Sequence, residues 1–183
     1  MVHAVEQVRE RLLRVSRALR GAGVTHVIVG GHAVAAWVAT VDEGAVRNTR
    51  DVDILVRRAD FPAVRRALEA AGFVHRHAAG LDLFLDTPDG NPRHGVNVVF
   101  ANEYVRAGEP SPSPDVSESS DMGELRVLNL DALVRVKLTA YRDKDRTHLR
   151  DLIDVGLIDR AWVDRLGGVL GERLRALLDT PEG

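Results

Sequence analysis

Two aspartates separated by one residue, Asp51 and Asp53, are the strongest candidates for chemistry in this sequence. They open the segment Asp51–Val56, where charged and apolar residues alternate as in a half-buried β-strand. Residues i and i+2 of a strand share a face, so the carboxylates project together and repel unless a cation lies between them. Mg²⁺ takes one or two carboxylates plus substrate phosphates, so the pair predicts a Mg²⁺ or Mn²⁺ site that also binds a nucleotide. Two solvated acids on an exposed strand are the alternative.

A diglycine, Gly30-Gly31, is the second feature that favours a nucleotide site. It follows an apolar segment predicted as a strand, residues 24–29, and precedes a helix predicted over His32–Ala39. Glycine lets the backbone approach a ligand closely, and N–H groups at a helix start attract anions. His32 lies where it can touch a phosphate or a base. A glycine needed only for a tight turn is the alternative, and the dinucleotide and Walker patterns are both absent.

The other elements must bring these two features together. Apolar residues at helical spacing predict a helix over 4–22, and Asp60 with Pro62 predicts the start of another that ends at Gly72. Strands are predicted over 73–77, 81–86 and 95–100, and helices over Asp131–Tyr141, over Asp145–Val155 and in one or two short pieces to residue 179.

The order of these elements predicts an α/β (α+β) fold, a mixed β-sheet flanked by helices. We assign residues 1–128 to the α/β core and residues 129–183 to a C-terminal helical region packed on it. The Ser-, Pro- and acid-rich stretch 108–123 is predicted as a mobile loop or a poorly packed hairpin. In the hairpin, residues 116–119 pair with 124–128 across Asp121–Gly123.

The composition limits the classes of function. No apolar run is long enough to span a bilayer, which predicts no membrane association. The absence of cysteine excludes disulfides, thiolate zinc sites and cysteine nucleophiles, and it fits a cytoplasmic protein. A net charge of −2 argues against a broad nucleic-acid surface. Arg11, Arg14, Arg17 and Arg20 form a stripe on the first helix, which we interpret as a solvated face; an RNA-directed toxin is the alternative.

Residues 27–35 (VIVGGHAVA) and 47–56 (RNTRDVDILV) together resemble the signature of the polymerase-β-type nucleotidyltransferase superfamily. The resemblance is greater to its small bacterial members related to abortive-infection toxins of the AbiE type, and residues 134–152 are similar to their C-terminal helical region. It implies a nucleotidyltransferase-like fold that moves a nucleoside monophosphate from a nucleoside triphosphate to an acceptor. The acceptor, whether RNA, protein or small molecule, stays open, and a toxin–antitoxin role with an antitoxin-like partner is implied as well.

The resemblance also implies roles for individual residues. Asp51 and Asp53 would hold the metal, and Gly30 and Gly31 would cradle the phosphates. Lys137 would neutralise the triphosphate, although a lysine reaching out from the edge of an apolar helix face is the alternative. The nucleotide site would further include residues of the two matching motifs: His32, Thr49 and Arg50. Three residues of the helical region have weaker claims, since they could form a salt-bridged helix surface: Lys144, Asp145 and Asp151.

One departure from the family pattern bears on catalysis. Active members bring a third carboxylate from a later strand, and this chain has Asn97 on the matching strand, residues 95–100. An amide can ligate a metal but cannot accept a proton, and loss of a general base costs about 10²- to 10⁴-fold in rate. Three explanations stay open. Asp82 or Asp86 is the third acid; one metal with a base carried by the substrate suffices; or the chain is a catalytically degenerate nucleotide-binding or regulatory module.

The pair His75 and His77 lies on one predicted strand face, at a spacing that zinc accepts. No third ligand accompanies them in the sequence, so we interpret both as surface residues.

Overall fold

A computed structural model gives the structure of the chain and describes residues 2–180. Seven strands form one mixed sheet in the order β3-β4-β5-β2-β1-β7-β6. The pairs β2–β5 and β1–β7 are parallel and the other neighbours are antiparallel. The strands are β1 (Val27–Val29), β2 (Val52–Val56), β3 (Val74–Ala78), β4 (Leu81–Leu85), β5 (Val96–Phe100), β6 (Ser119–Met122) and β7 (Leu125–Leu128).

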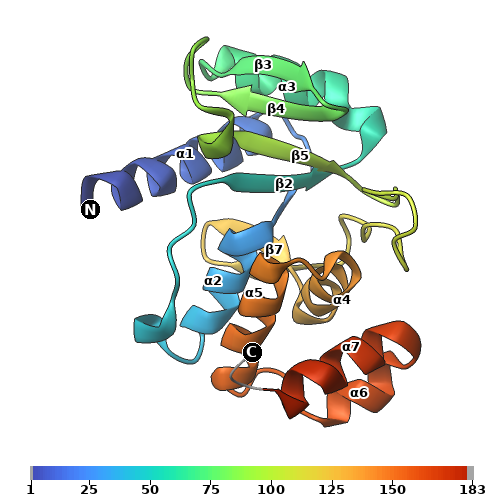
Figure 1. The fold of residues 1–183 in the computed structure, drawn as a ribbon. Coiled ribbons are helices and arrows are strands. Elements are labelled where there is room, and N and C mark those ends of the chain that lie inside the picture. Colours follow the sequence, from blue (N-terminus) through green and yellow to red (C-terminus); the bar gives the residue numbers. More distant parts are fainter. Residues whose placement is uncertain (1, 181–183) are drawn as a thin grey trace.

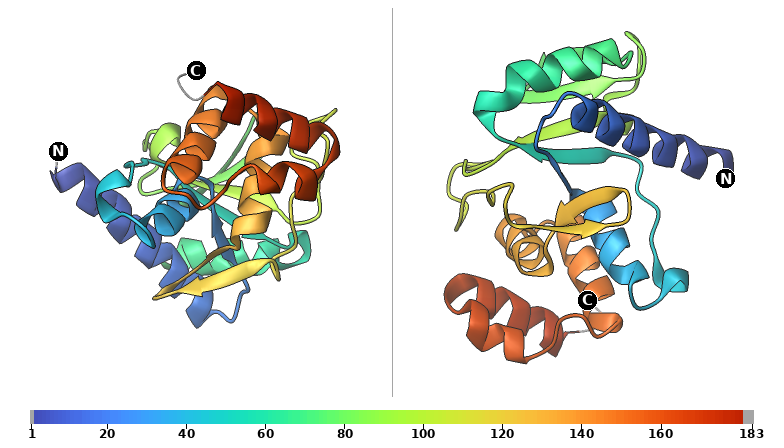
Figure 2. Two further views of the ribbon diagram at one scale, coloured as in Figure 1. Left: turned by 90° about the horizontal axis from the view of Figure 1, so that it is seen from below. Right: turned by 180° about the vertical axis from the view of Figure 1, so that it is seen from behind.

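Helices cover both faces of this sheet, which confirms the predicted α/β fold class. Figures 1 and 2 show α1 and α3 on one face and α2 with α5 on the other, while α6 and α7 pack outermost, beyond α4. The helices are α1 (Val2–Gly21), α2 (Gly30–Ala39), α3 (Phe61–Ala70), α4 (Leu130–Ala140), α5 (Asp143–Asp154), α6 (Ala161–Leu166) and α7 (Gly168–Asp179), with short 3₁₀ turns at Glu43–Ala45, Arg58–Asp60 and Pro92–His94.

Aliphatic side chains fill the core, as a chain with 4% aromatic residues requires. On α1, Leu12, Val15 and Leu19 are buried at helical spacing, and the chain leaves the helix at Gly23, whose φ is +68°. On β2, Val52 and Ile54 are buried on one face, which leaves Asp53 on the other. The alternation that buries Val52 and Ile54 therefore also turns the Asp53 carboxylate toward the opposite face of the sheet.

Three local expectations need correction. Asp60 stands at the N-terminus of α3 as predicted, but its side chain accepts no hydrogen bond from the helix. Strand β2 begins at Val52, so Asp51 lies just before it. The predicted hairpin exists with a different register: Met122 pairs with Leu125, and the turn is Gly123–Glu124. A two-residue turn with a positive φ at Gly123 suits a tight hairpin better than the predicted three-residue turn.

The division into a core (1–128) and a helical region (129–183) stays a prediction, as does the mobility of 108–123. The extreme ends, Met1 and residues 181–183, lie outside the described residues. Strand β6 falls within the stretch predicted as a loop or hairpin, and helix α4 begins at Leu130, directly after the predicted boundary.

Candidate nucleotide site

Gly30 is the first residue of α2, two residues before the predicted helix start at His32, and it brings the beginning of this helix into contact with Asp53. Val29 is the register partner of Asp53, so the helix begins beside this acid. Gly30 has a φ of +67°, and a Cβ at this position would lie 1.9 Å from Asp53 Oδ2. A Cβ on Gly31 would lie 2.8 Å from Thr49 Oγ1, on the segment leading to Asp51. Both glycines are therefore required by the close approach of the acidic segment, and not only by the turn.

Asp53 and Asn97 are neighbours on the parallel pair β2–β5. The Asn97 amide donates a hydrogen bond to Asp53 Oδ1 at 2.9 Å. Burial raises the pKa of the Asp53 carboxyl, and the nearby charge of Asp51 raises it further, against the Asn97 hydrogen bond, which lowers it. The structure thus puts Asn97 beside the acid pair, at an acid whose ionised form is disfavoured by burial and by the charge of Asp51.

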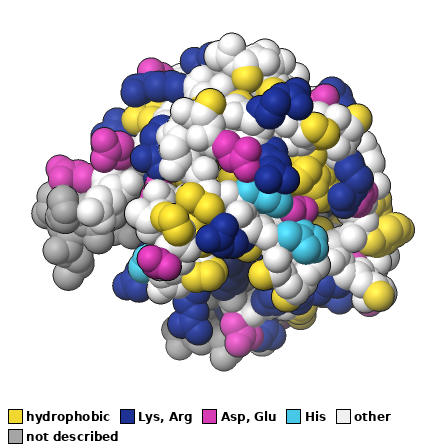
Figure 3. All heavy atoms as spheres, turned by 90° about the horizontal axis from the view of Figure 1, so that it is seen from above, with side chains coloured by type: hydrophobic (Ala, Val, Ile, Leu, Met, Phe, Trp, Pro, Cys, Tyr) yellow, Lys and Arg dark blue, Asp and Glu magenta, His cyan; other side chains and the backbone are white. Residues whose placement is uncertain are grey.

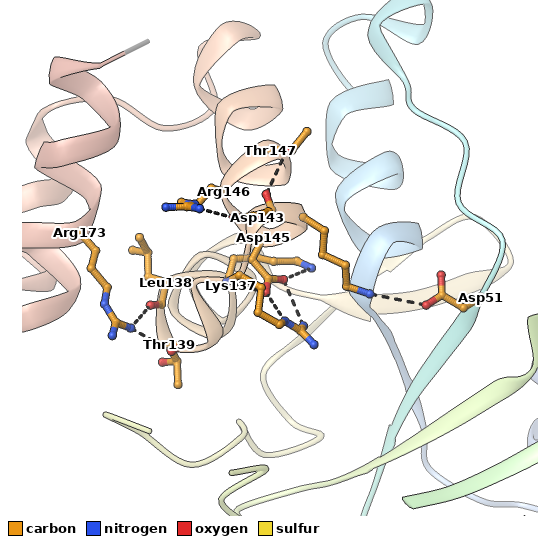
Figure 4. A network of polar contacts seen from close by, with 11 residues as sticks. Asp51, Lys137, Leu138, Thr139, Asp143, Asp145, Arg146, Thr147 and Arg173 are labelled. Atoms are coloured by element: carbon orange, nitrogen blue, oxygen red, sulfur yellow. Dashed lines mark hydrogen bonds and ion pairs between the residues drawn. The ribbon is translucent and has the colours of Figure 1, made fainter. Parts of the chain in front are cut away.

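Asp51 is held by two partners from opposite directions. Thr49 Oγ1 donates to Asp51 Oδ1 at 2.9 Å, and Lys144 Nζ of α5 lies 3.6 Å from Asp51 Oδ2 (Figure 4). Burial alone would raise the pKa of Asp51, but Lys144 and the Thr49 hydroxyl outweigh it and hold this pKa below its usual value. One acid of the pair is therefore stabilised as an anion while its neighbour is not.

Lys137 is buried inside the protein with its own counter-ion. Its Nζ lies 3.0 Å from Asp145 Oδ1, and the two side chains are only 3% and 2% exposed. Arg142 Nε donates to the second oxygen of Asp145 at 2.7 Å. Burial lowers the pKa of Lys137, and the charges of Asp145 and Asp53 oppose that shift. The alternative of a lysine reaching into solvent is therefore wrong, and the positive charge of Lys137 acts on Asp53 from within.

Two histidines near Asp51, His32 and His148, each have a ring nitrogen without a hydrogen-bond partner in the described part of the chain. His32 Nε2 and His148 Nδ1 are buried and have no hydrogen-bond partner among the described residues. Burial lowers the pKa of each ring to about 4. The charge of Asp51 acts on both rings, and the lysines of α4 and α5 further depress the pKa of His148. Both rings are therefore neutral at pH 7, and each keeps one buried nitrogen without a hydrogen-bond partner among the described residues.

These two histidines predict a loss of stability in mild acid. The unfolded chain binds a proton at each ring below its usual pKa of 6.5, whereas the folded chain does so only near 4. Stability is therefore full above pH 6.5 and falls as the pH drops toward 4. After a discount for solvent screening, we expect about 1–2 kcal/mol per histidine between pH 7.5 and pH 5. Urea unfolding of wild type, His32→Gln and His148→Gln checks this, and an unchanged pH dependence in both variants would contradict it.

The other predicted site residues lie around the aspartate pair or bind its neighbours. Arg50 is exposed, and its carbonyl accepts a 3.4 Å hydrogen bond from Arg11. Asp151 is buried and pairs with Arg47 at 2.7 Å, which fastens the loop before Asp51 to α5. Asp145 is the partner of Lys137. The structure thus brings Gly30, Gly31, Thr49, Asp51, Asp53 and Asn97 together, with the two lysines on α4 and α5 facing them.

His148 was missed by the sequence reasoning, and the contact of Lys144 with Asp51 was not foreseen. A signal was present: Lys144, His148 and Asp151 recur at i, i+4 and i+7 on α5 and so share one helix face. Two of the three contact the segment that contains Asp51.

Neither proposed substitute for a third carboxylate lies at this site. Leu83 is the register partner of Asn97, so Asp82 projects from the opposite face of the sheet from Asp53. Asp82 Oδ1 is within 2.8 Å of His75 Nε2 and 3.1 Å of His77 Nδ1. Asp86 is bound by Arg11 and Arg14 of α1. The structure thus argues against the first of the three explanations for Asn97, and the other two stay open.

The histidine pair on β3 differs in part from expectation. His77 is exposed as predicted, but His75 is only 14% exposed. Its ring packs against Phe61 and Phe84, with ring centroids 5.7 and 5.2 Å away. Among residues 2–180, no group of three or more His, Cys, Asp or Glu side chains is arranged to hold a metal ion. A metal on the aspartate pair must therefore take further ligands from a substrate or water.

The arginine stripe of α1 lies largely at the surface, as predicted, since Arg14, Arg17 and Arg20 are exposed, and it also contacts other parts of the chain. Arg11 and Arg14 bind Asp86, Arg17 lies 3.8 Å from Glu124, and Arg20 donates to the Glu124 carbonyl. On the face seen from above, basic, acidic and histidine side chains are interspersed (Figure 3). These contacts offset part of the stripe's charge, and the RNA-directed toxin stays an untested alternative.

Two hollows of about 390 and 400 Å³ lie away from the aspartate pair. They share Thr25, Asp121 and Arg126 and lie against the β6–β7 hairpin and the chain entering β1, whereas Gly30 follows the other end of that strand. No helix within residues 2–180 is long and apolar enough to cross a membrane.

Solved nucleotidyltransferases share this arrangement of strands and helices. The antibiotic-resistance factor ANT(2'')-Ia has a TM-score of 0.57 at 15% identity, over 97% of this chain and 93% of that chain. An antigenic nucleotidyltransferase-like protein from Paracoccidioides brasiliensis has a TM-score of 0.59 at 15% identity, over 96% and 88% of the two chains. At such identities the likeness defines the fold alone, which is that of nucleotidyltransferases.

The family follows from the sequence itself. A family model described as uncharacterised nucleotidyltransferase matches residues 2–117, and the chain belongs to this family. The match includes the diglycine, the aspartate pair and Asn97 and ends before the lysines of α4 and α5. Among curated proteins, none matches the chain.

Proposed function

We propose that this chain is a metal-dependent nucleotidyltransferase that moves a nucleoside monophosphate from a nucleoside triphosphate to an acceptor hydroxyl. The observation that carries the proposal is the contact of the Gly30 turn with the Asp53 carboxylate. It joins a helix N-terminus suited to phosphates with a pair of acids suited to Mg²⁺ or Mn²⁺. Family membership supports nucleotidyl transfer in general.

The residues fit a divalent cation on physical grounds. The Lys144 ammonium already stands near Asp51, as a cation would, and burial together with the charge of Asp51 raises the pKa of Asp53, which a bound cation would oppose. Asp51 and Asp53 would hold the metal, which would neutralise charge on the triphosphate and orient it for displacement.

The chain's own groups have separate tasks in this proposal. N–H groups at the start of α2, after Gly30 and Gly31, bind phosphate oxygens, and the helix dipole adds to the attraction. Asn97 holds the Asp53 carboxylate in place through its 2.9 Å hydrogen bond. Lys137 and Lys144 offset negative charge as the acceptor oxygen attacks the α-phosphorus and pyrophosphate leaves. His32, Thr49 and Arg50 line the approach of the nucleotide.

The acceptor and the biological role are the finer parts of the proposal. RNA, protein and small molecules all offer hydroxyls; one structural neighbour, ANT(2'')-Ia, was solved with adenylyl-2''-tobramycin, at a TM-score of 0.51 and 16% identity. We further propose that the protein is related to AbiE-type toxins, that it acts in a toxin–antitoxin pair with an antitoxin-like partner, and that it is located in the cytoplasm.

A transfer assay tests the proposal. Wild type and an Asp51→Asn/Asp53→Asn double variant are each incubated with four α-labelled nucleoside triphosphates, Mg²⁺ or Mn²⁺, and pools of RNA, protein and small-molecule acceptors. We expect label on one acceptor class with wild type and none with the double variant. Equal labelling by the two proteins would place the chemistry elsewhere.

A second candidate, a nucleotide-binding module without catalysis, is favoured by Asn97 alone. In that case the wild type shows no detectable transfer. Asn97→Asp then restores the missing base and makes transfer measurable, at a rate at least about 10²-fold above that of the wild type. If the site already works with Asn97, the new carboxylate, within hydrogen-bond distance of Asp53, instead repels it and lowers transfer at neutral pH. The sign of the change in transfer rate therefore separates the two candidates.

A further inference from the structure

The chain has only two lysines, Lys137 and Lys144, among 25 basic residues, and both act on the aspartate pair. Every other basic side chain is an arginine. An ammonium is a compact, strongly hydrated point charge, whereas a guanidinium is a planar fork that prefers two-point hydrogen bonding. The site thus combines the two groups in this protein that most resemble a small cation.

The two lysines differ in their freedom to move. Lys137 is buried and fixed by Asp145. Lys144 is 53% exposed and has no hydrogen bond shorter than its 3.6 Å approach to Asp51 Oδ2 within the described chain. That separation is beyond ordinary hydrogen-bond length, so the contact is a charge pair that can open at little cost. Because Thr49 already donates to Asp51 Oδ1, Lys144 stands at the other oxygen, the one left for a metal.

We propose that Lys144 is the resident counter-ion of the aspartate pair in the free protein, and that a divalent cation must displace it from Asp51 in order to bind. The inference rests on the proposed function and deepens it. Two like charges cannot share Asp51 Oδ2, so Lys144 opposes binding of the metal alone. A metal arriving with a triphosphate brings net negative charge, and the released ammonium then pairs with the phosphates. Lys144 thereby makes metal entry depend on the nucleotide.

A second polar side chain lies on the Lys144 face of α5. His148 lies one helical turn beyond Lys144 on α5, and its buried Nδ1 has no partner among the described residues. A neutral ring nitrogen accepts a hydrogen bond from an ammonium. Because this Nδ1 is buried and Lys144 is largely exposed, we expect the displaced ammonium to remain in solvent until a nucleotide binds.

Mn²⁺ titration without nucleotide, followed by electron paramagnetic resonance, tests the inference directly. We expect Lys144→Met to bind Mn²⁺ about threefold to tenfold more tightly than wild type, because a competing positive charge is gone. Lys144→Arg keeps the charge and serves as the matched control, with an affinity close to wild type. In the presence of a non-hydrolysable triphosphate the sign reverses, and Lys144→Met binds the Mn²⁺–nucleotide complex about fivefold more weakly.

The Lys144→Met substitution should thus strengthen Mn²⁺ binding without nucleotide and weaken it with nucleotide. A merely structural role of Lys144 would not produce these opposite changes in affinity. If Lys144→Met leaves nucleotide-free Mn²⁺ affinity unchanged or weakens it, the exchange is wrong, while loss of binding in Asp51→Asn still supports the metal site. If neither wild type nor Lys144→Met binds Mn²⁺ with or without nucleotide, both the inference and the metal dependence of the proposed function fail.

Amine labelling gives an independent readout, since Lys144 is the exposed lysine of the two. Mass spectrometry after limited acylation should show faster modification of Lys144 when Mn²⁺ is added alone, and slower modification with Mn²⁺ and nucleotide together. Equal rates under all three conditions would overturn the inference.

Discussion

Replacing Gly30 with alanine is expected to lower nucleotidyl transfer about 100-fold. The new Cβ would lie 1.9 Å from Asp53 Oδ2, so either the carboxylate or the turn must move by an ångström or more. A displacement of that size at a reacting site costs on the order of 10²-fold in rate. The φ of +67° adds a strain of about 1–2 kcal/mol to the folded state.

Gly23→Ala is the matched control for the backbone strain. Gly23 has nearly the same φ, +68°, but nothing lies within 4 Å of its would-be Cβ. In urea, both variants should therefore lose the unfolding free energy that the backbone strain costs, and Gly30→Ala should lose more because its Cβ also meets Asp53. Only Gly30→Ala loses transfer and metal-dependent nucleotide binding by calorimetry. Comparable activity losses in the two variants would mean that strain, and not the contact with Asp53, accounts for the effect.

Replacing Lys137 with methionine is expected to lower the free energy of unfolding by about 3–5 kcal/mol. The variant keeps the volume of the side chain but leaves Asp145, 2% exposed, with its charge uncompensated on that side. Arg142 still bonds Asp145 and softens the loss, so the lower half of this range is the better expectation. Urea unfolding at pH 7.5 measures the change.

The double variant Lys137→Met/Asp145→Leu separates pairing from packing. Removing both charges of a buried pair is often neutral, so the double variant should recover much of the lost stability. Neither form is expected to bind nucleotide as wild type does, because the positive charge of Lys137 near Asp53 is gone. A single variant within about 1 kcal/mol of wild type would contradict the account of Lys137 as a paired buried charge.

Periodicity predicted the elements of this fold where one face of an element is buried. Helix α1 was predicted from apolar residues at helical spacing, of which Leu12 and Leu19 are buried, and β2 was predicted from the alternation around Asp53. The register of the β6–β7 hairpin could not be predicted from the sequence. Asp121, Gly123 and Glu124 all suit turns, and no residue of β6 is buried to fix the pairing. The order of the strands in the sheet could not be predicted either, because neighbours such as β1 and β7 are far apart in the sequence.

The site was predicted where its residues are neighbours in sequence and left open where they meet through the fold. Asp51 with Asp53, and Gly30 with Gly31, were visible as short motifs. That Gly30 touches Asp53 was not, because it depends on the antiparallel register of β1 and β2. The pairing of Lys144 with Asp51 depends likewise on how α5 packs near the loop before β2. The roles of these residues in catalysis stay predictions.

A crystal structure with Mn²⁺ and a non-hydrolysable nucleoside triphosphate tests the central claim most directly. We predict one anomalous peak within about 2.2 Å of carboxylate oxygens of both Asp51 and Asp53. The triphosphate should lie against Gly31 and the start of α2, with Lys144 moved from Asp51 toward the phosphates. A nucleotide bound in the hollows beside Arg20 and Arg126, with no metal peak at the aspartate pair, would contradict it.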